Sequence, residues 1–275
     1  MANITAADVN KLRKQTGAGM MDCKNALVEA EGDFEKAVDI LRKKGQKIAA
    51  KRADRDATEG AVIALTNDDN TRGVVVSVNC ETDFVAKNDS FVELANKIAQ
   101  IALKEFPSST EELLQKPFDS SLTVAEKLTE QTGVIGEKIE ITAYERLEGP
   151  YVSSYIHMGN KIGTIVALSD SAEEAGKDVA MQAAAMNPVS LDADSVPQDV
   201  IARELEIGMD QARQEGKPED MVEKIAQGKL KKFYKEATLV EQQFIKDSKQ
   251  TVSQYLNSVK PGLKAIGFKR IGLGV

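Results

Sequence analysis

One order of predicted elements occurs twice along the chain, and this repeat restricts the fold more than any other feature of the sequence. Each copy has a strand, a short polar turn, a second apolar strand that begins close to a glycine, and a helix. The first copy covers residues 59–103 and the second covers residues 149–186. Two strands joined by a short turn pair in antiparallel fashion. We therefore expect an α+β fold with two related subdomains that contain antiparallel sheets.

The first 55 residues are predicted to form a separate helical unit. Thr5 is placed to cap a first helix, with Asp8 three residues later in a capping-box arrangement. The T-G-A-G segment at residues 16–19 ends this helix, and a second helix begins near residue 20. Asp33 caps a third helix with apolar residues at helical spacing. The sequence predicts a three-helix bundle of about 45 residues, a size that folds alone only marginally.

A charged helical segment at about residues 195–237 is interrupted by a G-K-P turn at residues 216–218. Its apolar positions form a narrow stripe made of Val200, Ile201, Leu205, Met209, Met221, Val222, Ile225 and Leu230. This pattern favours an antiparallel coiled-coil hairpin inserted into the second subdomain. The predicted division is a helical unit with a basic linker over residues 1–55, a first subdomain over 56–147 and a second over 148–275.

Composition limits the classes of protein that the chain can represent. The 275 residues are 42% hydrophobic and 29% charged, as expected for a chain that buries a core. A net charge of −7 argues against nucleic-acid binding over the whole surface. Two cysteines are too few for a disulfide framework, and no apolar run approaches the ~20 residues of a membrane helix. We expect a cytoplasmic protein that has no signal sequence and does not bind a membrane.

A basic stretch from Arg42 to Arg55 allows two interpretations. It is either an RNA-binding tail or the continuation of the third helix followed by a solvated linker. Aromatic residues that could stack on bases are not interleaved with these cations. The pattern favours the helix and linker. The RNA-binding alternative stays open, together with a second cationic cluster from Lys229 to Lys232.

Few residues of the chain suggest covalent chemistry. His157 is the single histidine and is expected within a strand, so any histidine-based triad or metal site depends on it alone. Cys23 and Cys80 lie in different units without metal-site spacing, and Glu81 and Asp83 have no partner base beside them. No phosphate-binding glycine motif follows a strand. We expect no catalytic residue, metal site or cofactor, and favour a surface that binds another macromolecule.

Two segments resemble a known family. They are T-G-A-G-M-M-D-C-K-N-A-L at residues 16–27 and N-C-E-T-D-F-V-A-K-N at residues 79–88. Further matches are S-Y-I-H-M-G-N-K-I-G, the G-K-P turn, G-K-L-K-K-F-Y and G-F-K-R-I-G-L-G. Over essentially its whole length the chain resembles bacterial-type elongation factor Ts. The resemblance implies a guanine nucleotide exchange factor for elongation factor Tu in translation elongation, without covalent chemistry of its own.

The resemblance also implies which residues release the nucleotide. The T-D-F-V segment, Thr82, Asp83, Phe84 and Val85, would enter the partner and dislocate its Mg²⁺ and phosphate site. We expect Phe84 to be the wedge, since exposed aromatic residues are frequent hot spots. Taken alone, an aromatic residue at the start of a helix is more often a core anchor, and that alternative competes with the expected exposed contact.

Four further contacts follow from the resemblance. Arg13, Met20 and Met21 match positions at which the N-terminal unit meets the nucleotide domain of the partner. His157 matches a residue that helps to displace the phosphate loop or touches another partner domain. Helix packing is the alternative role for the two methionines, of which at least one could belong to the core.

The resemblance implies a ubiquitin-associated-like N-terminal bundle and a partner bound in its GDP-bound and nucleotide-free states, without direct contact to nucleic acid. It leaves open a homodimer or a complex of two copies with two partner molecules. Longer members continue into another helix after the segment that ends this chain. Two alternatives of other classes remain: an RNA-binding translation accessory protein, and an enzyme centred on Asp83 or Cys80.

Overall fold

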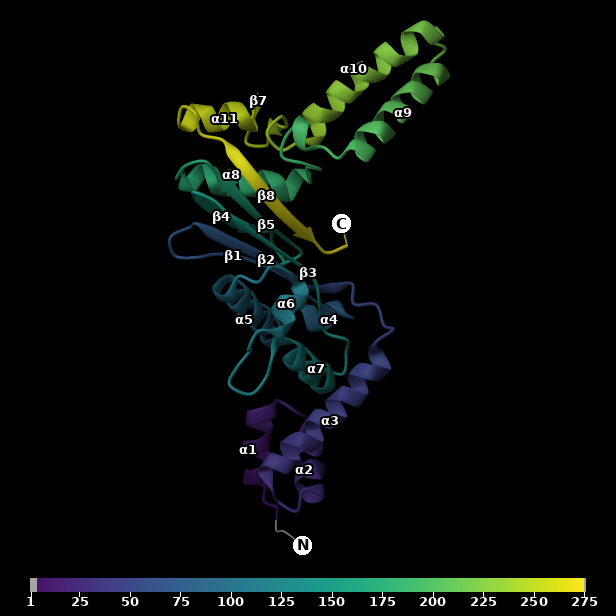
Figure 1. The fold of residues 1–275 in the computed structure, drawn as a ribbon. Coiled ribbons are helices and arrows are strands. Elements are labelled where there is room, and N and C mark those ends of the chain that lie inside the picture. Colours follow the sequence, from purple (N-terminus) through teal and green to yellow (C-terminus); the bar gives the residue numbers. More distant parts are fainter. Residues whose placement is uncertain (1–3, 275) are drawn as a thin grey trace.

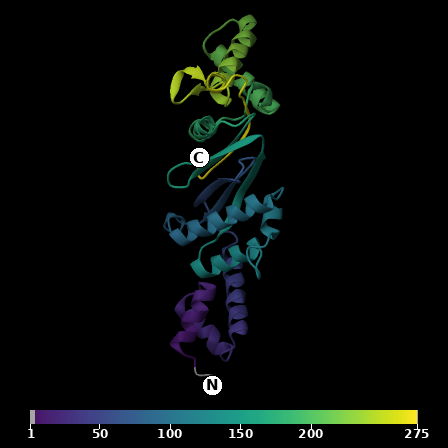
Figure 2. The ribbon, with the colours of Figure 1, turned by 90° about the vertical axis from the view of Figure 1, so that its left-hand side faces the viewer.

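The protein has an elongated shape in which helical units lie at both ends of a central pair of sheets. The computed structural model describes residues 4–274. A bundle of helices forms one end, the sheets and their covering helices form the middle, and a pair of long helices projects from the other end (Figure 1). Figure 2 shows the same succession after a quarter turn. Among the described residues, no helix combines the length and apolar character needed to cross a membrane.

The N-terminal bundle consists of three helices, α1 (Ala6–Thr16), α2 (Met20–Glu29) and α3 (Phe34–Arg52). Thr5 and Asp8 form the predicted capping box, and Gly17 ends α1 with a left-handed backbone (φ 70°). Asp33 caps α3 by accepting a hydrogen bond from the backbone N–H of Lys36. The buried side chains of the bundle are Val9, Leu12, Ala18, Cys23, Ala26, Leu27, Ala30 and Ala37.

The basic stretch is largely the second half of α3. This helix is 19 residues long and ends at Arg52, eleven residues after Leu41, the last of its apolar side chains that pack against the core of the bundle. The structure confirms the predicted continuation of the third helix. Arg42 and Arg52 are engaged within the chain, since Arg42 donates to the backbone oxygen of Ser121 and Arg52 pairs with Glu81.

The first sheet has three antiparallel strands in the order β1-β2-β3. The strands are β1 (Glu59–Thr66), β2 (Arg72–Cys80) and β3 (Glu140–Glu148). Between β2 and β3 the chain forms α4 (Asp83–Ala86), α5 (Asp89–Glu105), α6 (Thr110–Gln115) and α7 (Val124–Ile135). The sequence did not predict α6, which has six residues and is capped by Ser109.

The second sheet has the order β4-β5-β8, again antiparallel throughout. Its strands are β4 (Tyr151–Ile156), β5 (Ile162–Leu168) and β8 (Ala265–Gly272). The associated elements are α8 (Glu173–Met186), β6 (Gln243–Phe244), β7 (Asp247–Thr251) and α11 (Val252–Val259). The two-stranded β6–β7 sheet was not predicted. Both three-stranded sheets consist of a hairpin and a later third strand, which agrees with the predicted α+β fold and small antiparallel sheets.

The two sheets pack face to face, and a helix covers the outer face of each. Val62, Val75, Val152 and Ile165 lie between the sheets in one buried cluster. Side chains on the opposite faces pack against α5 in the first sheet and α8 in the second. Figure 1 shows α8 and α5 on opposite sides of the strands. The central strands β2 and β5 are therefore buried on both faces, which explains why V-V-V-S-V has four apolar residues in five instead of an alternating pattern.

Helices α9 (Gln198–Gln214) and α10 (Glu219–Ala237) form the projecting pair, preceded by the short 3-10 helix η1 (Ala193–Ser195). The apolar stripe was predicted only in part. Small residues make the closest contact, because a Cβ on Gly208 would lie 3.1 Å from the Cα of Ala226. Met221 is exposed, contrary to the prediction. The chain enters and leaves this pair at Ser190 and Thr238, which form an isolated parallel bridge.

Helix α3 crosses α7 at two glycines. Gly45 is buried, and a Cβ built on Gly133 would lie only 2.4 Å from the Cα of Gly45. A Cβ on Gly45 would instead lie 3.5 Å from the backbone oxygen of Thr129, an ordinary contact. The close approach of the two helices therefore requires glycine at residue 133 and tolerates a methyl group at residue 45.

The substitution Gly133→Ala should separate α3 from α7 and destabilise the protein by about 1–3 kcal/mol, because the clash involves backbone. Gly45→Ala is the matched control and should leave the stability unchanged or slightly increased, since alanine favours a helix. Thermal and urea unfolding followed by circular dichroism measure the difference. Equal destabilisation by the two substitutions would contradict the described crossing.

Candidate functional site

The T-D-F-V segment forms a single helical turn between β2 and α5. Thr82 has an extended backbone and caps α4, its hydroxyl accepting a hydrogen bond from the backbone N–H of Val85 at 3.5 Å. Asn88 then caps α5 by accepting from the backbone N–H of Ser90 at 3.0 Å. Two caps six residues apart leave α4 as a short projection at the edge of the first sheet.

Phe84 is 84% exposed, and this exposure excludes the core-anchor alternative. Its neighbours Val85 and Ala86 are partly buried and pack against the core beneath the first sheet. Consecutive residues of a helix point about 100° apart, so a turn that directs Val85 inward directs Phe84 outward. The ring therefore stands in solvent on a turn that is anchored from below.

Asp83 is paired with a cation on the same turn. Lys87 Nζ lies 2.7 Å from Asp83 Oδ2, four residues apart along the chain. The hydrogen bond from Lys87 lowers the pKa of Asp83, with smaller contributions from charges that include Lys161. The carboxylate is therefore ionised at neutral pH, which does not suit a general acid.

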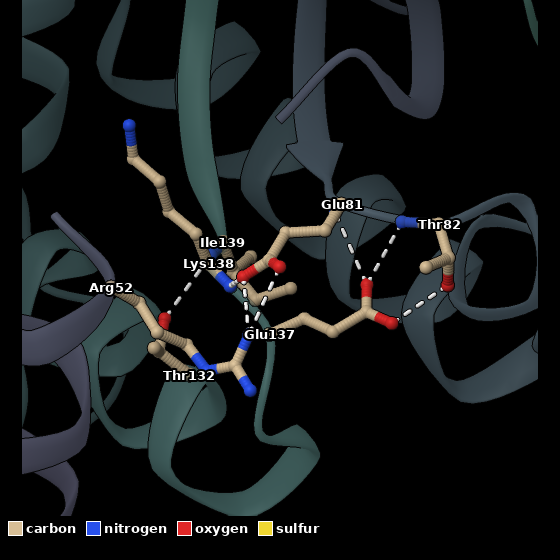
Figure 3. Close-up of polar contacts among 7 residues, drawn as sticks. All are labelled: Arg52, Glu81, Thr82, Thr132, Glu137, Lys138 and Ile139. Carbon is tan, nitrogen blue, oxygen red and sulfur yellow. Dashed lines mark hydrogen bonds and ion pairs between the residues drawn. The ribbon is translucent and has the colours of Figure 1, made fainter. Parts of the chain in front are cut away.

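Glu81 is held by two groups from distant parts of the chain (Figure 3). The backbone N–H of Lys138 donates to Glu81 Oε1 at 2.7 Å, and Arg52 Nη1 donates to both carboxylate oxygens at 2.7 and 2.9 Å. These contacts, the one from Lys138 first, lower the pKa of Glu81. These contacts of the Glu81 carboxylate therefore stabilise the folded protein at neutral pH. Their contribution to the free energy of unfolding is lost only as the pH falls below the ordinary pKa range of a glutamate.

Glu137 was not predicted as part of the site, although it contacts the T-D-F-V segment directly. Its Oε2 accepts from the backbone N–H groups of Glu81 and Thr82 at 3.1 and 3.0 Å, and its Oε1 accepts from the Thr82 hydroxyl at 2.7 Å. Figure 3 shows the carboxylate facing both residues. More than 50 residues separate Glu137 from them in the chain, so no local pattern indicates the contact.

His157 lies one residue beyond the end of β4, which corrects its predicted place within a strand. The register of β4 and β5 ends at the pair of Ile156 and Gly163, and the backbone N–H of His157 then donates to Ile162 across the turn at 2.9 Å. The ring is exposed and lies within hydrogen-bond distance of the Tyr155 hydroxyl, with Nδ1 at 3.1 Å.

The turn that follows His157 lies beside the start of β1. Lys161 Nζ is 3.2 Å from Glu59 Oε2, and the backbone N–H of Val62 donates to Asn160 at 2.7 Å. Helix α4 contacts the same strand. The structure thus brings the turn after β4 and the T-D-F-V segment to a common strand. Met158 in this turn is 89% exposed and was not singled out in the sequence.

The other predicted contacts lie on the N-terminal bundle, apart from α4. Arg13 is exposed on α1, and Met20 and Met21 are 53% and 63% exposed at the start of α2. Both methionines are therefore on the surface, and the alternative that one of them belongs to the core is wrong. Figure 1 shows α1 and α2 at the end of the molecule, below the region that holds α4.

The groups that an enzyme would use are arranged unfavourably for catalysis. Cys80 is fully buried, its thiol donates to the backbone oxygen of Thr82 at 3.2 Å, and burial raises its pKa to about 12. Burial also raises the pKa of the fully buried Cys23 thiol. Within residues 4–274, no group of three or more His, Cys, Asp or Glu side chains is gathered around a potential metal position.

Both thiols should resist modification in the folded protein. We expect them to react with Ellman's reagent at pH 8 at least about 100-fold more slowly than in the chain unfolded in guanidinium, because access requires local opening. The absorbance of the released thiolate measures both rates, and the unfolded sample is the control. Rapid modification of one thiol in the native state would contradict the described burial.

Comparison with known proteins assigns the family. Residues 81–275 match the sequence model described as Elongation factor TS. The chain is 61% identical over 277 residues to the elongation factor Ts of Christiangramia forsetii, and 57% identical over 277 residues to that of Flavobacterium psychrophilum, with 100% of each chain covered. It is 49% identical over 271 residues to that of Porphyromonas gingivalis, with 98% of each chain covered. The chain therefore belongs to the elongation factor Ts family.

Proposed function

We propose that the protein is the guanine nucleotide exchange factor of elongation factor Tu and acts in translation elongation in the cytoplasm. Its family membership supports this function, and one structural observation carries the mechanism. Phe84 is the second most exposed large apolar residue of the described chain and projects from a turn that is anchored to the protein core. An aromatic ring held outside its own core is suited to enter a pocket of another protein.

The exchange reaction follows from how a GTPase holds GDP. Backbone amides and a bound Mg²⁺ compensate the charge of the phosphates. Phe84 enters beside this site as a wedge, and Thr82, Asp83 and Val85 accompany it. The intrusion dislocates the Mg²⁺ and the phosphate-binding loop of elongation factor Tu. GDP then dissociates faster because its charge compensation is lost, and GTP can bind.

Linkage determines the direction of the effect. A factor that binds the nucleotide-free GTPase more tightly than the GDP-bound form must weaken the affinity for GDP by the same factor. The protein therefore changes how fast the nucleotide exchanges and forms no covalent intermediate. The concentrations of GTP and GDP determine which nucleotide is bound afterwards.

The remaining predicted residues extend the contact. Arg13, Met20 and Met21 on the N-terminal bundle bind the nucleotide domain of the partner, and His157 contributes beside α4. Two surfaces on one elongated chain bind better than either alone when both reach the partner together.

The bundle is ubiquitin-associated-like, and α9 and α10 form a coiled-coil arm of the second subdomain. We assign the units to residues 1–55, 56–147 and 148–275.

The RNA-binding alternative is not favoured. Arg52 pairs with Glu81, and Arg42 donates to Ser121, so these two cations of the basic stretch are engaged within the chain. In the second cluster, Lys229 pairs with Glu215 and Lys232 with Glu236. Each pairing reduces the charge that remains to attract phosphates.

Stopped-flow release of a fluorescent GDP from elongation factor Tu tests the function. The protein should accelerate release at micromolar concentration, and Phe84→Ala should reduce this acceleration about 30-fold, as expected for a hot spot of roughly 2 kcal/mol. Thermal unfolding should be unchanged, since the ring is exposed. Val259→Ala, which removes another exposed apolar side chain at the end of α11, should retain full activity.

Absence of acceleration by the unmodified protein would refute the exchange function. If Phe84→Ala instead lost its thermal transition, the residue would stabilise the core and the proposed role would be wrong.

A further inference from the structure

Two successive hydrogen bonds connect Glu137 to the helical turn that carries Phe84. The Thr82 hydroxyl donates its proton to Glu137 Oε1 at 2.7 Å, and its oxygen accepts the backbone N–H of Val85. A hydroxyl has one proton, so its commitment to Glu137 leaves the oxygen lone pairs free to cap α4. Glu137 thereby selects the rotamer of Thr82 that starts the turn.

Glu137 also fixes the backbone immediately before α4. Its second oxygen accepts from the N–H groups of Glu81 and Thr82 at 3.1 and 3.0 Å. Glu81 is held at the same time from the other side by Arg52 and by the backbone of Lys138. The last residue before the T-D-F-V segment is therefore bound through both its backbone and its side chain (Figure 3).

The elements that supply these groups are themselves joined closely. Arg52 is the last residue of α3, and Glu137 follows α7 directly after its cap, Gly136. The two helices cross at Gly45 and Gly133, within about two helical turns of the two contacts. The contacts to Glu81 and Thr82 thus originate from one closely packed crossing that also connects the N-terminal bundle to the first sheet.

A four-residue helix cannot maintain its own direction. Isolated helices of this length are not stable in water, because nucleation is unfavourable. The exposed ring of Phe84 receives no packing that would fix it, and only Val85 and Ala86 anchor the turn from below. Without Glu137, the entrance to the turn would lose three hydrogen bonds, and the segment would have to be ordered when it binds.

We propose that Glu137 is a positioning residue for nucleotide exchange, which acts through Thr82 to hold Phe84 in the direction needed for insertion. This inference rests on the proposed exchange function and extends it to a residue outside the T-D-F-V segment. Glu137 has no direct contact with the partner in this role. Its effect on exchange therefore requires Phe84 to be present.

The experiment compares Glu137→Ala, Glu137→Gln and a matched control, Glu126→Ala. Glu126 also accepts from the backbone N–H and hydroxyl of a capping threonine, Thr123, at 2.8 and 3.1 Å. It lies near the other end of the 12-residue helix α7, about 16 Å away along the helix axis. The two alanine variants therefore remove the same kind of contact at different places.

Glu137→Ala should lower the second-order rate constant for GDP release about tenfold, which corresponds to about 1.4 kcal/mol. Glu137→Gln retains one acceptor oxygen and should lose less, whereas Glu126→Ala should be unchanged. In the Phe84→Ala background, Glu137→Ala should have no further effect. Amide hydrogen exchange should accelerate at Glu81 and Thr82 in Glu137→Ala, and at Thr123 in Glu126→Ala.

The outcomes separate this inference from the function on which it rests. If the unmodified protein does not accelerate release, the exchange function fails. If it does so and Glu137→Ala is equally active, the positioning role is refuted. Equal losses for Glu137→Ala with and without Phe84 would also refute it, because they would show an effect independent of the ring. The amide exchange measurement needs no partner and tests the contacts themselves.

Discussion

The contact between the two sheets is the constraint on which the rest of the structure depends. Gly73 and Gly163 allow it, since a Cβ on either would lie within 2.8 Å of a valine of the opposite sheet. The inner faces of the two sheets pack against each other. The apolar outer faces are covered by helices, α5 on the first sheet and α8 on the second. The remaining elements are attached to the ends of this four-layer arrangement. The surface that carries α4 is thus supported by a core buried on both sides.

Local signals predicted most of the elements. The capping residues Thr5 and Asp33 mark helix starts that the structure reproduces, and the hairpins follow from apolar strands separated by polar turns. The sequence could not predict contacts between distant segments. Glu137 has no local signature, since its role arises only when the end of α7 meets the end of β2. The glycine and alanine contacts of α9 and α10 were missed because small residues carry little hydrophobic signal.

At the candidate site, the residue pattern and the family resemblance led to different predictions. An aromatic residue at the start of a helix, such as Phe84, is by itself expected in the core, and only the resemblance to the family indicated an exposed position. The structure explains the exposure through the rotation between Phe84 and Val85. The carboxylates nearby, Asp83, Glu81 and Glu59, are each paired with a cation. Glu137 also lies beside the segment and is engaged by hydrogen bonds to Glu81 and Thr82, so the negative charge around the exposed ring is compensated only in part.

The projecting arm has a consequence for how chains of this kind can vary. Its two ends meet at the bridge of Ser190 and Thr238, where the backbone N–H of Leu239 also donates to Ser190 at 2.9 Å. Because Ser190 and Thr238 are neighbours in space, a chain without the arm could connect them directly by a very short loop. Whole turns could be added to or removed from α9 and α10 in pairs while the sheets kept their places. Arm length is thus a modular property, free to change in evolution or engineering independently of the stacked sheets.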